Sequence, residues 1–138
     1  HGDALTFLVD ACQARITSAA IADYLARGAT VMLTGSKFMG GPPFNGFALT
    51  PAAAVTRAAP VPDGLGTVFR RAEWPAGWAG AEALPEEANP GLLLRYEASV
   101  FELERFQRLP IERVERVVLA FHAAVRAAFV ERLGGRRI

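Results

Sequence analysis

Lysine occurs once in this chain of 138 residues, as Lys37, while the other 14 of the 15 basic residues are arginine. Arginine can replace lysine wherever a positive charge is sufficient, but its guanidinium group does not lose its proton in proteins. A neutral amine is needed to form a Schiff base with a carbonyl compound. The single lysine therefore suggests a nucleophilic amine, with a solvated loop lysine as the alternative.

The residues around Lys37 also invite comparison with phosphate-binding loops. The stretch 34–46 reads TGSKFMGGPPFNG and follows an apolar run. The Walker motif requires G-x-x-x-x-G-K-[ST], whereas Ser36 precedes the lysine here and Phe38 follows it. The dinucleotide motif G-x-G-x-x-G is missing from the sequence as well. These mismatches argue against a nucleotide-binding loop.

A carboxylate at a comparable position suggests a different chemistry for the lysine. Asp10 ends one apolar run, and Lys37 follows the end of the next one. In an open α/β sheet, ligands bind at the carboxyl ends of the strands. A carboxylate facing a pyridinium nitrogen, together with a lysine Schiff base, is what a protein supplies to pyridoxal phosphate. A structural aspartate at a strand end is the alternative for Asp10.

The elements that would position these two residues form a βαβ pattern. Residues 4–11 predict a buried strand, and Thr17 or Ser18 can cap a helix that runs to Ala26 and stops at Gly28. Two further strands are predicted, over 30–34 and 46–51. The predicted fold class is therefore α/β with a parallel or mixed sheet.

The rest of the chain predicts an irregular segment followed by two long helices. Residues 52–88 are rich in proline, and only 67–71 (TVFRR) resembles a strand there. Asn89 and Pro90 suit the start of a helix, and a second helix is predicted from Pro110 to Leu133. The predicted organisation is one segment with three parts: 1–51, 52–88 and 89–138. Trp74 and Trp78 are expected to form a small packing cluster.

Composition limits the partners that the chain can have. The formal net charge is +1, so no strong field attracts nucleic acid or an anionic membrane. No apolar stretch reaches the roughly 18 residues that a membrane span needs. The single cysteine, Cys12, cannot form an internal disulfide, and it is expected to be a packing residue. We therefore expect a cytoplasmic protein that binds neither nucleic acid nor membrane.

Three stretches resemble a known family. VDACQAR (9–15) and TGSKFMGGPPFNGFAL (34–49) resemble the cofactor-binding stretches of fold-type I pyridoxal-phosphate enzymes. The most similar group is that of the class V aminotransferases, which includes cysteine desulfurases and kynureninases. ANPGLLLRYEAS (88–99) is similar to a helix start in the same group. The resemblance covers most of residues 4–108.

The resemblance implies a role for each residue of the site. Asp10 would pair with the pyridine nitrogen of pyridoxal 5'-phosphate, and Gln13 would hydrogen-bond its phenolic oxygen. Lys37 would form the internal aldimine, and Thr34 and Ser36 would contact the phosphate. Desulfurases commonly have histidine immediately before the lysine and kynureninases tyrosine, so Ser36 departs from both patterns.

The resemblance also implies a setting for the chain. It would be the central part of a pyridoxal-phosphate transferase large domain, with the N-terminal half and the small domain lying outside these 138 residues. The whole enzyme would act on an amino acid as a homodimer, whereas the isolated segment would be inactive. The reaction type stays open. The alternative is an inactive or excised segment of the same fold, kept for dimerisation or scaffolding.

Overall fold

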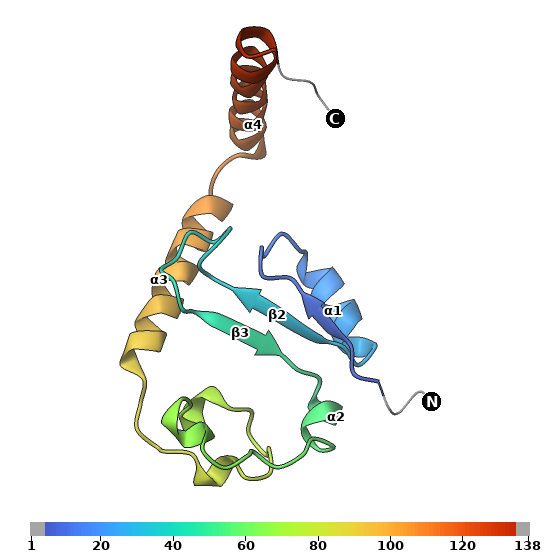
Figure 1. Ribbon diagram of the computed structural model, residues 1–138, viewed down its shortest axis with the longest axis vertical. Coiled ribbons are helices and arrows are strands. Elements are labelled where there is room, and N and C mark those ends of the chain that lie inside the picture. The colour runs from blue at the N-terminus through green and yellow to red at the C-terminus, as the bar shows by residue number, and fades with distance from the viewer. Residues whose placement is uncertain (1–4, 135–138) are drawn as a thin grey trace. The chain divides into compact units, whose positions relative to one another are not determined.

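A computed structural model describes residues 5–134 and divides the chain into two compact units, His1–Glu102 and Leu103–Ile138. The boundary falls inside one long helix, α3 (Pro90–Gln107). The first unit combines helices with a three-stranded sheet, and the second is helical (Figure 1). The predicted α/β class is confirmed at this level.

The sheet is small and mixed. It consists of β1 (Leu8–Asp10), β2 (Thr30–Thr34) and β3 (Gly46–Leu49) in the order β1-β2-β3. β1 runs parallel to β2, with Asp10 opposite Met32, while β3 runs antiparallel to β2. The carboxyl ends of β1 and β2 therefore lie at the same edge of the sheet (Figure 1).

The helix between the parallel strands has the predicted ends. α1 (Ser18–Ala26) begins after Thr17, whose Oγ1 accepts a hydrogen bond of 3.2 Å from the backbone N–H of Ala20. This bond satisfies one of the backbone donors that a helix start leaves free. The helix is followed by Gly28 at φ +83°, a conformation that costs glycine little. The βαβ prediction is confirmed, since β1 and β2 are parallel and α1 lies between them in the chain. The two helix ends could be predicted because the Thr17 cap and Gly28 are local signals.

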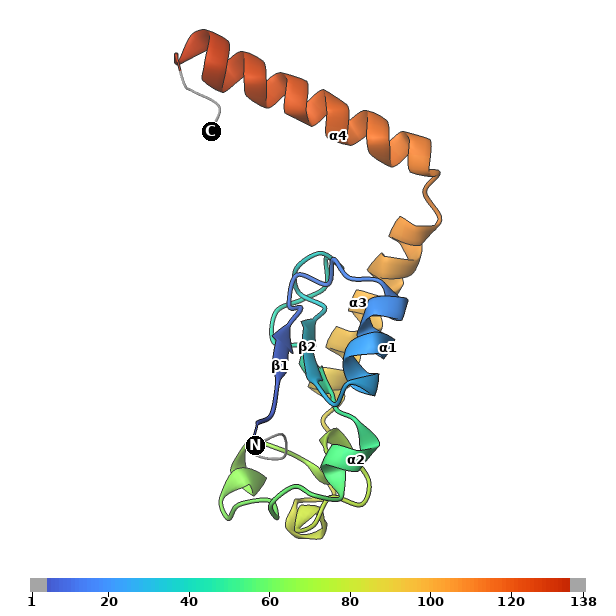
Figure 2. The same cartoon turned by 90° about the vertical axis from the view of Figure 1, so that its right-hand side faces the viewer.

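Within residues 5–134, helices cover only one face of the sheet. α1 and the first part of α3 lie on the same side of the strands (Figure 2). That side carries the buried Val31 and Leu33, whereas Leu8 and Met32 alternate with them and are exposed.

The prediction of a buried strand over 4–11 was therefore wrong in two respects. β1 spans only Leu8–Asp10, and Leu8 is 62% exposed. β1 is an edge strand that pairs only with β2, and its outer face has no helix over it among residues 5–134. Ala4, the first residue of the predicted strand, lies outside the described residues.

The segment after β3 is mostly irregular, as expected, but it contains short helical turns. α2 (Ala52–Val55) comes first, and three 3₁₀ turns follow at Leu65–Thr67, Arg71–Glu73 and Ala81–Ala83. The strand predicted over 67–71 was wrong. The backbone N–H groups of 67–69 bond to carbonyls three or four residues back, as in Phe69 N to Leu65 O at 2.8 Å. Those of Arg70 and Arg71 donate to the Glu73 carboxylate and the Pro85 carbonyl, so 67–71 does not join the sheet.

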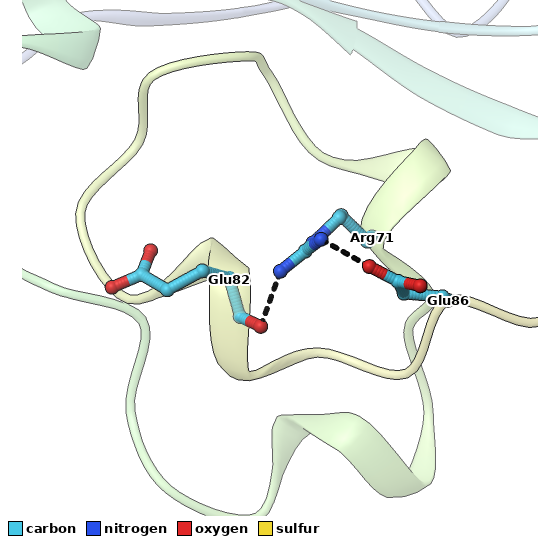
Figure 3. Close-up of polar contacts among 3 residues, drawn as sticks. All are labelled: Arg71, Glu82 and Glu86. Carbon is cyan, nitrogen blue, oxygen red and sulfur yellow. Dashed lines mark hydrogen bonds and ion pairs between the residues drawn. The ribbon is translucent and has the colours of Figure 1, made fainter.

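An arginine and an aromatic cluster hold this segment together. The guanidinium of Arg71 donates to the carbonyl oxygen of Glu82 and to the carboxylate of Glu86, both at 2.5 Å (Figure 3). The ring of Trp74 packs edge-on against those of Phe69 and Trp78, with centroids 5.1 and 5.6 Å apart. The predicted packing of the two tryptophans is confirmed.

α3 begins where the sequence predicts it. The side-chain oxygen of Asn89 accepts from the backbone N–H of Leu92 at 3.1 Å, and Pro90 occupies the first helical position. The hydroxyl of Tyr96 donates to the carbonyl of Gly46 at 2.8 Å, and its ring packs edge-on against Phe47. These contacts join α3 to β3.

The second unit is dominated by α4 (Ile111–Arg126), which continues as a π-helical stretch over Ala127–Arg132. The predicted helix from Pro110 to Leu133 is confirmed apart from this change of hydrogen-bonding pattern. Gly134 follows at φ +65°, and Gly135 lies outside the described residues. Within residues 5–134, no helix is both long enough and apolar enough to cross a membrane.

Candidate functional site

Asp10 and Lys37 lie at one edge of the sheet. Asp10 is the last residue of β1, and Lys37 follows the last residue of β2 by three positions. Hydrogen bonds from Cys12 lower the pKa of Asp10, and the positive charge of Lys37 lowers it to a lesser extent. Both side chains are exposed, so a ligand can reach them.

The turn after β1 fixes the carboxylate of Asp10. The backbone N–H of Cys12 donates to its Oδ1 at 3.0 Å, which is the bond of an Asx turn. This bond, followed by one from the Cys12 side chain, holds the pKa of Asp10 below its ordinary value. Asp10 is therefore an anion at neutral pH with acceptor positions left over.

Cys12 is poorly suited to act as a nucleophile. Its hydrogen bond with Asp10 and the negative charge of that residue raise the pKa of the thiol. Its sulfur also lies 3.9 Å from the carbonyl oxygen of Met32 on β2. A thiol that stays protonated reacts slowly, because the thiolate is the reactive form.

Gln13 lies in the same turn and is exposed. The turn closes with a bond of 2.7 Å from the N–H of Ala14 to the carbonyl of Ala11. Ala14 has φ +54°, an uncommon conformation for a residue other than glycine. Gln13 thus follows Asp10 closely at the same sheet edge, as its expected role requires.

Thr34 and Ser36 contact each other at the end of β2. Their hydroxyl oxygens are 2.9 Å apart, and the backbone N–H of Ser36 donates to Thr34 Oγ1 at 3.3 Å. Thr34 is buried and Ser36 half-buried. Thr34 and Asp10 also lie on the same face of the sheet, because Asp10 pairs with Met32 and alternate residues of β2 share a face.

Two polar residues that the sequence did not single out lie behind this pair. Asn45 is fully buried, and Ser99 on α3 is 2% exposed. The side-chain amide of Asn45 donates to Ser99 Oγ, while its oxygen accepts from Thr34 Oγ1 at 3.1 Å. Ser99 is 54 positions away from Asn45, so no local pattern could have predicted the pair. A small polar residue among the apolar residues of α3 was the only available signal.

Glycines allow α3 to approach the lysine loop, defined here as residues 34–46. A Cβ on Gly35 would lie 2.6 Å from Asn45 Nδ2, and one on Gly41 would lie 2.9 Å from Ser99 Cα. Both distances are too short for real atoms, so these positions require glycine. The loop closes on itself through Gly41 N to Gly35 O at 2.9 Å and Gly40 N to Lys37 O at 2.9 Å.

The described residues contain no cluster of three or more histidine, cysteine, aspartate or glutamate side chains that could hold a metal ion. No protein-family model matches the chain, and neither a curated protein nor a solved structure shows significant similarity to it.

Proposed function

We propose that this chain is the cofactor-binding part of a pyridoxal-5'-phosphate-dependent enzyme that acts on an amino acid, with Lys37 as the residue that attaches the cofactor. The observation that carries the proposal is the placement of Asp10 and Lys37 at the carboxyl ends of two adjacent parallel strands. Asp10 ends β1, and Lys37 follows β2 by three positions.

The donors and acceptors at this edge fit the cofactor. Asp10 is ionised and can accept a hydrogen bond from a protonated pyridine nitrogen. Gln13, three residues further on in the same turn, offers an amide donor for the phenolic oxygen. Thr34 and Ser36, at the start of the lysine loop, offer hydroxyl groups for the phosphate. Bound in this way, the cofactor supplies an electron sink for bonds at the amino-acid α-carbon.

The residues of the chain would divide the remaining work. The carboxylate of Asp10 keeps the proton on the ring nitrogen, because an adjacent anion favours the protonated form. The Lys37 amine attaches the cofactor and can afterwards carry a proton at Nζ. Arginine cannot perform this role, since it does not become a neutral amine. The same proposal implies the large-domain fold of fold-type I enzymes, a homodimer and a cytoplasmic setting.

Borohydride trapping tests the proposal on the chain as it exists. The chain is incubated with pyridoxal 5'-phosphate and reduced, and the modified peptide is mapped by mass spectrometry. We expect the phosphopyridoxyl group on Lys37, and a near-ultraviolet absorbance band that disappears on reduction. Trapping accumulates product, so even the weak binding expected of an isolated segment is detectable.

Lys37→Arg is the matched control, because it keeps the positive charge and removes the neutral amine. It should abolish both the band and the adduct. Label found only on the N-terminal amine, or equal labelling of the variant, would refute the assignment of Lys37. Asp10→Asn should weaken trapping at Lys37 without moving the label to another amine.

A second candidate function is a dimerisation or scaffold segment of the same fold. The observation in its favour is the exposed apolar side chains beside and on β1, where Phe7 and Leu8 are 65% and 62% exposed. Sedimentation analysis of the wild-type chain tests it. A stable dimer that traps no cofactor at Lys37 would favour this second function.

A further inference from the structure

A chain of hydrogen bonds runs from the backbone of α3 to the hydroxyl of Ser36. We propose that Asn45 and Ser99 are positioning residues, which act through Thr34 to hold Ser36 where its hydroxyl can turn to the phosphate of the ligand. The inference rests on the proposed function, and it assigns different roles to the two hydroxyl residues beside Lys37. Ser36 donates to the phosphate, and Thr34 orients Ser36.

The donor-to-acceptor direction of these hydrogen bonds is set at α3. Ser99 Oγ donates to the backbone carbonyl of Arg95 at 2.7 Å, and a carbonyl can only accept. A serine hydroxyl has one hydrogen, so Ser99 must accept the bond from the amide nitrogen of Asn45. The same amide nitrogen lies 3.5 Å from the Arg95 carbonyl. The orientation of the Asn45 amide is therefore determined by its partners.

The next bonds follow from this orientation. The Asn45 side-chain oxygen faces Thr34 and accepts its only hydroxyl hydrogen at 3.1 Å. The contact of 2.9 Å between Thr34 and Ser36 must then be a bond donated by the Ser36 hydroxyl. Thr34 Oγ1 also accepts from the backbone N–H of Ser36 at 3.3 Å. This backbone bond does not use the Ser36 hydroxyl, so Thr34 still positions Ser36 when the hydroxyl turns to another acceptor.

Ser36 is thus the last residue in this series of hydrogen bonds. An arriving anion can accept the hydrogen that its hydroxyl otherwise donates to Thr34. It is half-buried at the sheet edge, whereas Thr34 is buried and its hydrogen is already committed to Asn45. A phosphate oxygen is a stronger acceptor than the neutral Thr34 hydroxyl, because hydrogen bonds to charged groups are stronger. The ligand chemistry that fits is a phosphate ester bound beside Lys37.

The backbone keeps Asn45 in this position. Phe44 has φ +63° while its side chain is 84% exposed, so the strained conformation is not explained by packing of the ring. The turn that Phe44 makes directs the next residue inward, where Asn45 is fully buried. Gly35 and Gly41 leave the space in which Ser99 reaches it.

The test compares two probes that differ only in the phosphate, pyridoxal 5'-phosphate and pyridoxal. Both are trapped on the full chain with borohydride, and the ratio of their yields on Lys37 is measured over a concentration series. Ser36→Ala should lower the preference for the phosphorylated probe about tenfold or more. Ser99→Ala and Thr34→Val should lower this preference about three- to tenfold.

Thr34→Ser is the conservative control, since it keeps the hydroxyl and should keep the preference. Asn45→Ala leaves several buried groups unpaired, so it is interpreted only if its circular dichroism spectrum matches the wild type. If its spectrum differs, the comparison of Thr34→Val with Thr34→Ser decides the test.

Each outcome separates the two proposals. If Ser99→Ala and Thr34→Val reduce trapping of both probes equally, these residues are merely structural, and the inference is wrong. A wild-type chain that traps both probes equally at Lys37 also overturns it, while the proposed function survives. A wild-type chain that traps neither probe at Lys37 overturns the function and the inference together.

Discussion

Two irregular segments of the first unit are stabilised by different physical means. The lysine loop (34–46) is held by buried hydrogen bonds between side chains, centred on Asn45. The segment that we call the aromatic loop, 59–86, is held by ring packing around Trp74 and by the bonds of Arg71. Both segments contain prolines and several glycines, so composition alone does not distinguish them.

The two kinds of contact have different consequences. Hydrogen bonds are directional, and a buried network with every partner assigned fixes the orientation of each group in it. Ring packing is largely a matter of buried area, with a weaker preference for edge-on geometry. The lysine loop is therefore suited to aiming side chains, and the aromatic loop to contributing stability. Mutations in the two loops should separate these properties.

The largest effect on stability is expected from Trp74→Ala. The Trp74 ring contacts both Phe69 and Trp78, so truncation removes both edge-on pairs of the cluster. We expect a loss of about 3 kcal/mol in the free energy of unfolding, the lower end for large aromatic truncations because Trp74 is only partly buried. Urea unfolding followed by circular dichroism measures it. Trapping at Lys37 should change little under conditions where the variant stays folded.

Conservative changes in the same cluster provide the control. The indole N–H of Trp74 is buried without an acceptor among the described residues, whereas that of Trp78 donates to the Ala59 carbonyl at 3.0 Å. Trp74→Phe should therefore cost less than Trp78→Phe. The opposite order would mean that the Trp74 N–H has a partner that matters.

The next largest effect is expected from Gly41→Ala in the lysine loop. The added Cβ would lie 2.9 Å from Ser99 Cα, a backbone atom that cannot turn aside. Overpacking of this kind costs about 1–3 kcal/mol, and the displaced loop should also trap less pyridoxal phosphate at Lys37. Gly46→Ala is the control, because its Cβ meets nothing closer than the Leu33 carbonyl at 3.7 Å. Equal effects of the two variants would contradict close packing between Gly41 and Ser99.

The sequence predicted the features that depend on neighbouring residues. α1 and α3 begin at the expected caps, Thr17 and Asn89, because each cap bonds to a backbone N–H three residues ahead. The apolar run 30–34 became β2, and its parallel pairing with β1 followed from the helix between them. Asp10 and Lys37 were expected at one edge for the same reason.

The features that failed or were missed depend on distant residues. TVFRR has strand-forming residues, but within residues 5–134 no strand pairs with it, and its first and last residues belong to two 3₁₀ turns. The exposure of Leu8 depends on which face of the sheet the helices cover. Asn45 and Ser99 meet across 54 positions, so only the folded chain reveals them. The roles of the site residues toward the cofactor stay predictions.

A smaller effect, dependent on pH, is expected from Asp10→Asn. The hydrogen bonds from Cys12, and to a lesser extent the charge of Lys37, hold the pKa of Asp10 below its ordinary value. A carboxyl whose pKa is lower in the folded state stabilises the fold at pH values above its pKa in the unfolded state. This contribution is lost as the pH falls through the pKa of the folded state. The wild type should therefore exceed Asp10→Asn in urea midpoint at pH 6, with a smaller difference at pH 3. A difference that does not change with pH would show that ionised Asp10 adds no stability.

The smallest effect is expected from Glu86→Gln in the aromatic loop. The ion pair of Glu86 with Arg71 is short, but the two side chains are 78% and 42% exposed. Exposed pairs contribute about 0.2–1 kcal/mol and are screened by salt. The unfolding midpoint should fall slightly at low salt, and the difference should vanish at about 1 M salt. Arg71→Ala should cost more, and keep most of that cost in salt, because it also removes the bond to the Glu82 carbonyl. Equal, fully salt-sensitive losses in both variants would mean that charge, and not the backbone bond, secures this arginine.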